Sequence, residues 1–140
     1  MSALPAFAAI AVGDRLPPLA KAAVNRVQLA LYAGASGDHN PIHLDDERAK
    51  AVKLPGVIAH GMLTMAFLGQ LVASWAPLTH IRSLGGRFAA MVRLGDVVTC
   101  TGIVAAKTAE RGENRLTIDI VAETATGEKA VLGQAVIAVP

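Results

Sequence analysis

The densest group of polar side chains lies between Asp38 and Asp45, within an otherwise apolar chain. Asp38 and His43 are five positions apart, and Pro41 between them fixes one φ angle and keeps Asn40 out of helical geometry. A turned loop of this length could aim both side chains at one point. A carboxylate beside an imidazole can act as an acid/base unit, because both groups can hold one water. The same spacing also suits a purely structural role, in which Asp38 caps the turn and His43 caps the next helix.

A second group, Ala59-His60-Gly61-Met62, opens a long apolar run that predicts a helix. The start of a helix presents unpaired amides and the positive end of its dipole. At Gly61 no Cβ would hinder a ligand that approaches this backbone, so the segment would suit an oxyanion hole for a carbonyl. Alternatively, Gly61 only permits close packing. For His60 we expect the role of a hydrogen-bonded core histidine.

A metal site is the main alternative chemistry. His43-Leu44-Asp45 is an H-x-D pair, which His60 or His80 could complete as a two-histidine, one-carboxylate site. Such a pair should lie on a strand, yet this one runs into an acidic helix start, so we expect no metal. The single cysteine, Cys100, lies in a predicted strand without a nearby basic partner, and we interpret it as a core residue.

Composition excludes several classes of protein. The chain has 140 residues, 53% hydrophobic and 17% charged, which predicts one folded domain over residues 1–140. A net charge of +2 and 4% aromatic residues argue against nucleic-acid binding. With one cysteine no internal disulfide can form, which favours a reducing cytoplasm. So much apolar surface in a small chain also predicts a subunit interface.

The elements that would position these residues follow from the periodicity. Asn25 is a good N-cap for a helix that reaches Gly34, and a short helix is expected from Asp45 to Val52. Residues 54–81 carry no Asp, Glu, Lys or Arg, but Pro55 and Pro77 interrupt this run, which argues against a membrane span. Gly61 to Trp75 should be a helix buried on all sides, with a sheet packed closely on its small residues Ala66, Gly69 and Ala73.

The rest of the chain is strand-like. Residues 1–12 are expected to form a first strand rather than a signal peptide. Alternation and turn signals predict four antiparallel strands at 87–92, 96–106, 114–124 and 128–139. One buried helix with such a sheet makes an α+β domain.

The segment from Tyr32 to His43, together with Ile58-Ala59-His60-Gly61-Met62, resembles the signature of the MaoC-like (R)-specific enoyl hydratase family. The resemblance implies a hotdog fold, in which a curved antiparallel sheet wraps a long central helix. It also implies that Asp38 and His43 are the catalytic pair and that the Gly61 amide is the oxyanion donor. Ser36, Asn40, His60 and Met62 would shape the loop or bind substrate.

The implied reaction is the reversible hydration of trans-2-enoyl thioesters to (R)-3-hydroxyacyl thioesters, carried by coenzyme A or acyl-carrier protein, with no metal or other cofactor. A hotdog thioesterase is one alternative, but it usually needs a carboxylate on the central helix, and residues 62–75 contain none. A non-catalytic, acyl-carrier-binding partner subunit is the other, although the Asp–His pair argues against it. The family also implies a homodimer or larger assembly, or a hetero-oligomer with a sister hotdog chain.

Overall fold

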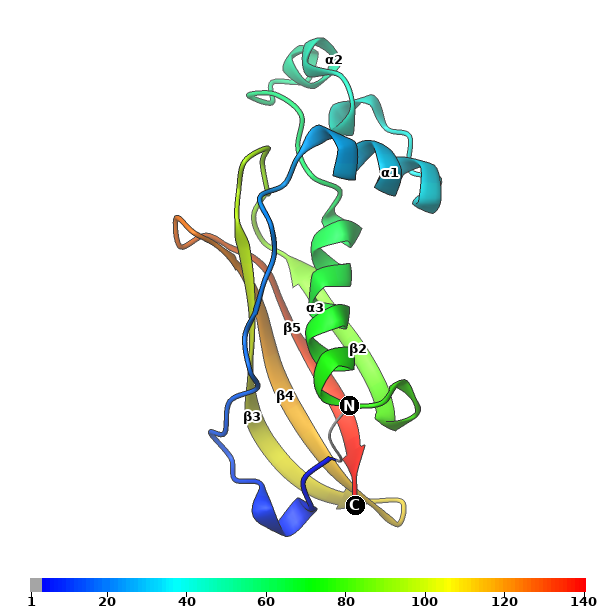
Figure 1. The fold of residues 1–140 in the computed structure, drawn as a ribbon, viewed down its shortest axis with the longest axis vertical. Coiled ribbons are helices and arrows are strands. Elements are labelled where there is room, and N and C mark those ends of the chain that lie inside the picture. The colour runs from blue at the N-terminus through cyan, green and yellow to red at the C-terminus, as the bar shows by residue number, and fades with distance from the viewer. Residues whose placement is uncertain (1–3) are drawn as a thin grey trace.

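The computed structural model describes residues 4–140 as one long helix against a curved antiparallel sheet, with two shorter helices beyond the N-terminal end of the long one (Figure 1). The helices are α1 (Arg26–Ser36), α2 (Asp46–Ala51) and α3 (Gly61–Trp75), with short 3-10 turns η1 (Phe7–Ala9), η2 (Pro41–His43) and η3 (Leu78–His80). The strands are β1 (Leu19–Ala20), β2 (Ile81–Phe88), β3 (Val98–Glu110), β4 (Glu113–Thr124) and β5 (Lys129–Val139). The α+β prediction is thus confirmed.

The sheet has the strand order β1-β3-β4-β5-β2, and every neighbouring pair is antiparallel. Strands β3 and β4 are joined at Arg111-Gly112, where both residues have positive φ, 52° and 77°. Such turns match the right-handed twist of the strands they connect. Along β4 the expected alternation is present, because every second side chain is fully buried: Leu116, Ile118, Ile120 and Ala122.

Helix α3 has the predicted bounds but not the predicted packing. Its large apolar side chains, such as Phe67, Leu68 and Leu71, are buried in the core it shares with the sheet. The opposite side of the helix, including Ala66, is exposed. The expectation of burial on all sides was therefore wrong. Of the small residues, Gly69 does face the sheet, since a Cβ there would lie 3.6 Å from Leu84 of β2, whereas Ala66 is exposed. Large side chains are needed to fill the space between helix and sheet, and the sheet of one chain covers only one side. Across residues 4–140, no helix is long and apolar enough to cross a membrane.

The N-terminal expectation was also wrong where it can be compared. Residues 1–3 lie outside the described part, residues 7–9 form the turn η1, and the first strand is β1. Main-chain hydrogen bonds from the amides of Gly13, Leu16 and Lys21 to carbonyls of β3 cover that side of the sheet. This segment pairs without the alternating pattern that sequence reasoning requires.

Strand β2 begins at Ile81 rather than at Arg87. Its sequence lacks alternation because it carries Gly85-Gly86 and lies at the edge of the sheet, with no residue of it fully buried. On its partner β5, a Cβ at Gly133 would lie 2.2 Å from the carbonyl oxygen of Gly85, so only glycine fits there. Close backbone approach, rather than side-chain packing, defines this pairing.

Candidate active site

The loop after α1 is shaped by short-range hydrogen bonds from main chain to side chain. Ser36 Oγ accepts from the Asp38 amide, Asp38 Oδ1 accepts from the Asn40 amide, and Asn40 Oδ1 accepts from the Ile42 amide, each at 3.2 Å. Gly37 allows the turn out of the helix because its φ is 75°. Polar residues and glycine thus fold this segment into successive turns, as their types favour. The side chains of Ser36 and Asn40 contact the loop itself.

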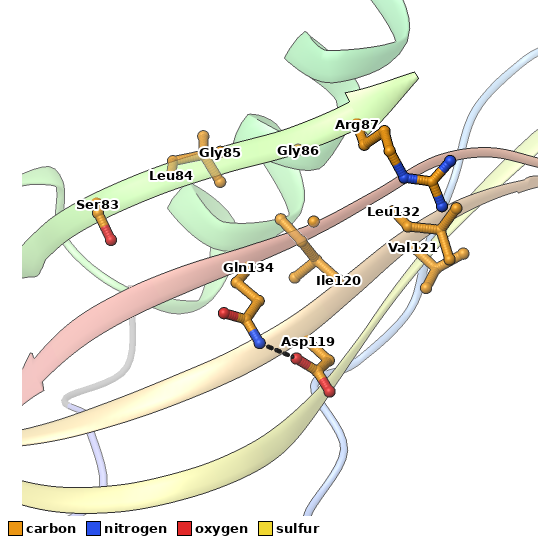
Figure 2. A pocket seen from close by; sticks show the side chains of 11 residues that line it. Ser83, Leu84, Gly85, Gly86, Arg87, Asp119, Ile120, Val121, Leu132 and Gln134 are labelled. Carbon is orange, nitrogen blue, oxygen red and sulfur yellow. Dashed lines mark hydrogen bonds between the residues drawn. The ribbon is translucent and has the colours of Figure 1, made fainter. Parts of the chain in front are cut away.

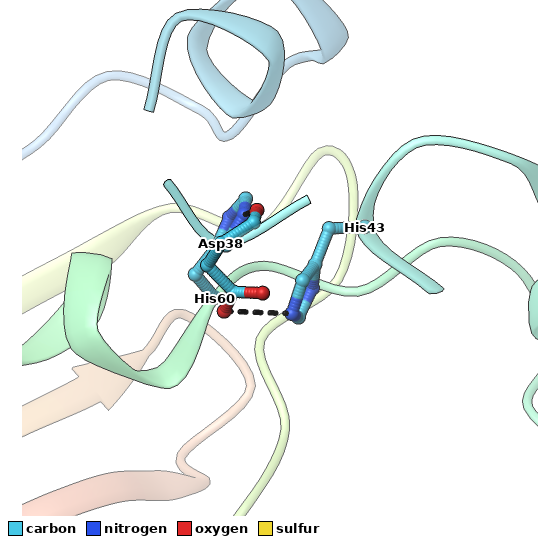
Figure 3. A group of neighbouring side chains, drawn as sticks. All are labelled: Asp38, His43 and His60. Atoms are coloured by element: carbon cyan, nitrogen blue, oxygen red, sulfur yellow. Dashed lines mark hydrogen bonds and ion pairs between the residues drawn. The ribbon is translucent and has the colours of Figure 1, made fainter. Parts of the chain in front are cut away.

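The orientation of His43 follows from a hydrogen bond to the chain that precedes α3. Its Nδ1 lies 2.8 Å from the carbonyl oxygen of Ile58, which can only accept, so Nδ1 carries the proton in the neutral ring. The lone pair is then on Nε2, which lies 3.7 Å from Asp38 Oδ2 (Figure 3). The ring is buried, while the Asp38 side chain is 51% exposed. Nε2 and the carboxylate therefore face each other at a distance that leaves both free to bind a third group.

His60 lies between this pair and the start of α3. It is 1% exposed, and its Nε2–H donates to the carbonyl oxygen of Asp38 over 3.1 Å. Its ring stacks on that of His43, with centroids 3.8 Å apart and 26° between the planes. Burial lowers the pKa of His60, and the nearby His43 lowers it further, while the bond to Asp38 opposes the shift. His60 is buried and hydrogen-bonded, as the sequence predicted for it.

Gly61 is the first residue of α3 and borders a cavity of about 160 Å³. A Cβ at this position would lie 3.2 Å from the ring of Phe88, so a substitution here would meet that ring. Met62 is 57% exposed and does not line the cavity. Sequence reasoning missed the wall that Phe88 and the segment after it provide, because nothing local marks these residues as neighbours of Gly61. The lining residues are His43, Ile58, Ala59, Gly61, Thr64, Phe88, Ala90, Met91, Val92 and Val131.

A larger hollow of about 740 Å³ lies over β2, β4 and β5, away from these residues (Figure 2). Its polar lining includes Asp119, which accepts a 2.7 Å hydrogen bond from Gln134, and Arg87. None of the candidate catalytic residues reaches it. Of the candidate residues, His43 and Gly61 line the smaller cavity instead.

One cluster of the described residues could supply ligands to a metal ion. Potential ligand atoms of Asp38, His43 and His60 lie within 4.8 Å of one another. An imidazole binds a metal in the plane of its ring at about 2 Å, and two stacked rings cannot both direct a lone pair at one ion. The other metal site considered combines His43 and Asp45 with His60 or His80. Asp45 caps α2, however, and His80 Nδ1 hydrogen-bonds the carbonyl oxygen of Ala138. The donor directions therefore do not favour either of the two metal sites considered.

The structure thus brings Asp38, His43, His60 and Gly61 together at one end of α3, beside a small apolar cavity. A family model described as MaoC-like domain matches residues 9–126. Together with a sheet packed against one long helix, this architecture is the hotdog fold. The chain belongs to the MaoC-like family.

Individual relatives are consistent with this assignment. An (R)-specific enoyl-CoA hydratase of Rhodospirillum rubrum is 31% identical over 84% of this chain and 81% of its own length. The unliganded R-hydratase PhaJ1 of Pseudomonas aeruginosa superimposes with a TM-score of 0.84 at 30% identity, covering 96% of this chain and 85% of that chain. An (R)-hydratase of A. caviae, involved in PHA biosynthesis, gives a TM-score of 0.81 at 28% identity over 94% and 98%.

Other matches cover only part of the relative. The chain spans 4% of a fatty acid synthase subunit beta of Aspergillus oryzae, which is 38% identical over half of this chain. It spans 42% of the 3-hydroxyacyl-thioester dehydratase Z of Mycobacterium tuberculosis, also 38% identical, over 45% of this chain. The similarity thus extends to dehydratases as well as hydratases.

Proposed function

We propose that this protein catalyses the reversible hydration of trans-2-enoyl thioesters to (R)-3-hydroxyacyl thioesters, within a single domain of residues 1–140. The observation that carries the proposal is the Nδ1–H bond of His43 to Ile58, which leaves Nε2 free beside the Asp38 carboxylate. Membership of the MaoC-like family and the named hydratase relatives support the same reaction. An acid/base pair beside an apolar cavity suits a substrate with an acyl chain.

In this mechanism one water lies between Asp38 Oδ2 and His43 Nε2. The 3.7 Å gap is too long for a direct hydrogen bond, but both atoms can accept from the same water. The water oxygen attacks C3 of the enoyl group while one of its protons moves to Nε2, and the imidazolium then passes that proton to C2, which regenerates the neutral ring. The Asp38 carboxylate stabilises the imidazolium formed in between. The two groups act as one unit, and the net change is the addition of water across the double bond.

Negative charge builds on the thioester oxygen during this step, and the Gly61 amide is the donor we assign to it. The first amides of a helix have no acceptors within the helix, and the dipole of the 15-residue α3 favours negative charge at this end. Gly61 also borders the cavity that holds His43. Removing one such donor typically costs ~3–4 kcal/mol of transition-state stabilisation.

Crotonyl-CoA tests the proposal directly. Loss of the enoyl absorbance without release of thiol is the expected result. Release of free thiol would instead show a thioesterase, and no reaction in the folded protein would favour a non-catalytic partner subunit. Thioester hydrolysis is also not supported, since hotdog thioesterases usually use a carboxylate on the central helix and α3 carries none.

We further propose that the protein works as a homodimer joined at the free edge of β2. This strand lies at the edge of the sheet, most of it is exposed, and Leu84, Phe88 and Met91 add exposed apolar surface nearby. An open edge of this kind pairs readily with another chain unless charges or prolines protect it. Sedimentation of the purified protein should give a dimer, whereas an active monomer at micromolar concentration would refute this. An inactive dimer that gains activity with a second hotdog chain would indicate a hetero-oligomer.

The single cysteine takes no part in the proposed chemistry, and the carrier of the acyl group is the last point of the proposal. Burial raises the pKa of the Cys100 thiol to about 11, so it is unreactive. Because one cysteine allows no internal disulfide, we propose that the chain works in the cytoplasm. Either coenzyme A or acyl-carrier protein is proposed to carry the acyl group. Phosphate groups on either carrier would need a basic partner. Arg82 is unsuitable for this, because its guanidinium already donates hydrogen bonds to the Glu113 carboxylate and to the carbonyl oxygen of Thr79.

A further inference from the structure

His60 contacts every part of the proposed catalytic site, although the mechanism above assigns it no step. Its Nε2–H donates to the Asp38 carbonyl, its ring stacks on His43, and it directly precedes Gly61 at the start of α3. The ring of Tyr32 lies on it as well, at 4.8 Å between centroids and 58° between the planes. With 1% exposure, the side chain has no route to substrate in this arrangement.

The distance between Asp38 and His43 must be held by other residues. Asp38 Oδ2 and His43 Nε2 are 3.7 Å apart and make no direct hydrogen bond that would hold them. The His43 ring is held by Ile58 on its Nδ1 side and by the His60 ring on its face. The Asp38 main chain is held by His60 Nε2–H. One side chain thus restrains both members of the pair.

We infer that His60 is a positioning residue of the proposed hydratase reaction, which keeps Asp38 and His43 at the separation where they share one water, and that it does so as a neutral ring. This inference rests on the proposed function. Its effect should fall on the chemical step rather than on binding, because His60 touches the acid/base pair and not the cavity.

The neutral state follows from the contacts of the two ring nitrogens. Nε2 must carry hydrogen, since its partner is a carbonyl oxygen, and Nδ1 is buried without any hydrogen-bond partner. A second proton on Nδ1 would thus be buried without an acceptor, beside a ring that becomes positive during the reaction. The groups that face His60 are His43 from η2, Asp38 from the loop and Tyr32 from α1. Burial lowers the pKa of His60 in agreement with this, and the site's catalytic proton is therefore left to His43.

Two substitutions separate the hydrogen bond from the stack. His60→Phe keeps a flat ring but removes the donor to Asp38, and we expect kcat for crotonyl-CoA to fall about 100-fold, because small misplacements cost roughly this much, with KM changed less than about twofold. His60→Gln restores an N–H near the position of Nε2 and loses only the ring stack. Because Ile58 still holds His43 through Nδ1, kcat should recover to within about fivefold of the wild type. His80→Phe is the matched control, since His80 Nδ1 also bonds a carbonyl, that of Ala138, but at the other end of α3. It should leave kcat unchanged.

Stability against pH tests the neutral ring independently. A histidine whose pKa is lowered by folding stabilises fully above its unfolded value of about 6.5 and loses that contribution as pH falls below it. The wild type should therefore lose thermal stability between about pH 6.5 and 5 more steeply than His60→Gln or His60→Phe, while His80→Phe should follow the wild type.

Several results would overturn the inference. A folded His60→Phe protein with wild-type kcat would do so, as would a His60→Gln protein that loses as much kcat as His60→Phe. If His60→Phe fails to fold, His60→Gln alone decides, and a tenfold loss of kcat or an unchanged loss of stability in acid would contradict it. A folded wild type inactive on enoyl thioesters would refute the hydratase proposal and this inference together, whereas an active wild type with an unaffected His60→Phe refutes this inference alone.

Discussion

Replacing Gly61 with alanine tests the oxyanion donor while it changes the protein by one methyl group. The added Cβ would lie 3.2 Å from two ring atoms of Phe88, a few tenths of an ångström closer than ordinary contact. The contact is short by only a few tenths of an ångström, so a small shift of the ring relieves it, and replacing glycine by alanine reduces the conformational entropy lost on folding. The thermal stability of Gly61→Ala should therefore stay close to that of the wild type.

Activity should respond very differently. The methyl group occupies the open side of the Gly61 amide, where the thioester oxygen must approach, so the hydrogen bond to the developing enolate is lost or lengthened. Loss of one oxyanion donor costs ~3–4 kcal/mol, so kcat/KM for crotonyl-CoA should fall about 10²- to 10³-fold. The assay is the initial rate of loss of enoyl absorbance, measured on protein of confirmed thermal stability.

Two further variants separate this explanation from others. Gly69→Ala is the matched control on the same helix, because a Cβ there would meet Leu84 at an ordinary 3.6 Å, and it should remain fully active. Adding Phe88→Leu to Gly61→Ala relieves the contact with the ring. If this second change restored activity, displacement of Phe88 would explain the loss, and wild-type kcat/KM in Gly61→Ala alone would refute the oxyanion role.

Three other predictions concern the acid/base pair, metals and acid stability. Asp38→Asn and His43→Ala should each lower kcat/KM by about 10²–10⁴-fold in a folded protein, and the double variant should be little worse, since groups that act as one unit are not additive; near-wild-type turnover in either would contradict the mechanism. Dialysis against a chelator should leave crotonyl-CoA hydration unchanged, and restoration of lost activity by zinc or iron alone would contradict this. The guanidinium of Arg82 lowers the pKa of Glu113 to about 2, from its usual 4.5. The Arg82–Glu113 ion pair therefore stabilises the fold fully above about pH 4.5, and this contribution is lost as pH falls toward 2. Glu113→Gln should flatten thermal stability over that interval, and a curve parallel to the wild type would show that the pair contributes nothing.

Much of this site could be predicted from sequence because its local geometry is set by neighbours in the chain. Asn25 caps α1 and Asp45 caps α2 through hydrogen bonds to amides two or three residues away. The loop around Asn40 turns through bonds that span two residues each. Helix α3 begins at Gly61 and ends at Trp75 as its apolar run indicated. Interactions of such short range depend on residue type, which the sequence states directly.

Only the tertiary structure decided which surfaces meet. Apolar periodicity could not reveal that the large side chains of α3 pack against the sheet. Nor could it reveal that β2 pairs with β5 through close backbone contact at Gly133. The partners of the two histidines, Ile58 for His43 and Asp38 for His60, lie 15 and 22 residues away in the chain. A tautomer and the separation of an acid/base pair depend on such long-range contacts. They are set by how the helix, loop and sheet pack together, and no pattern within a single segment encodes that packing.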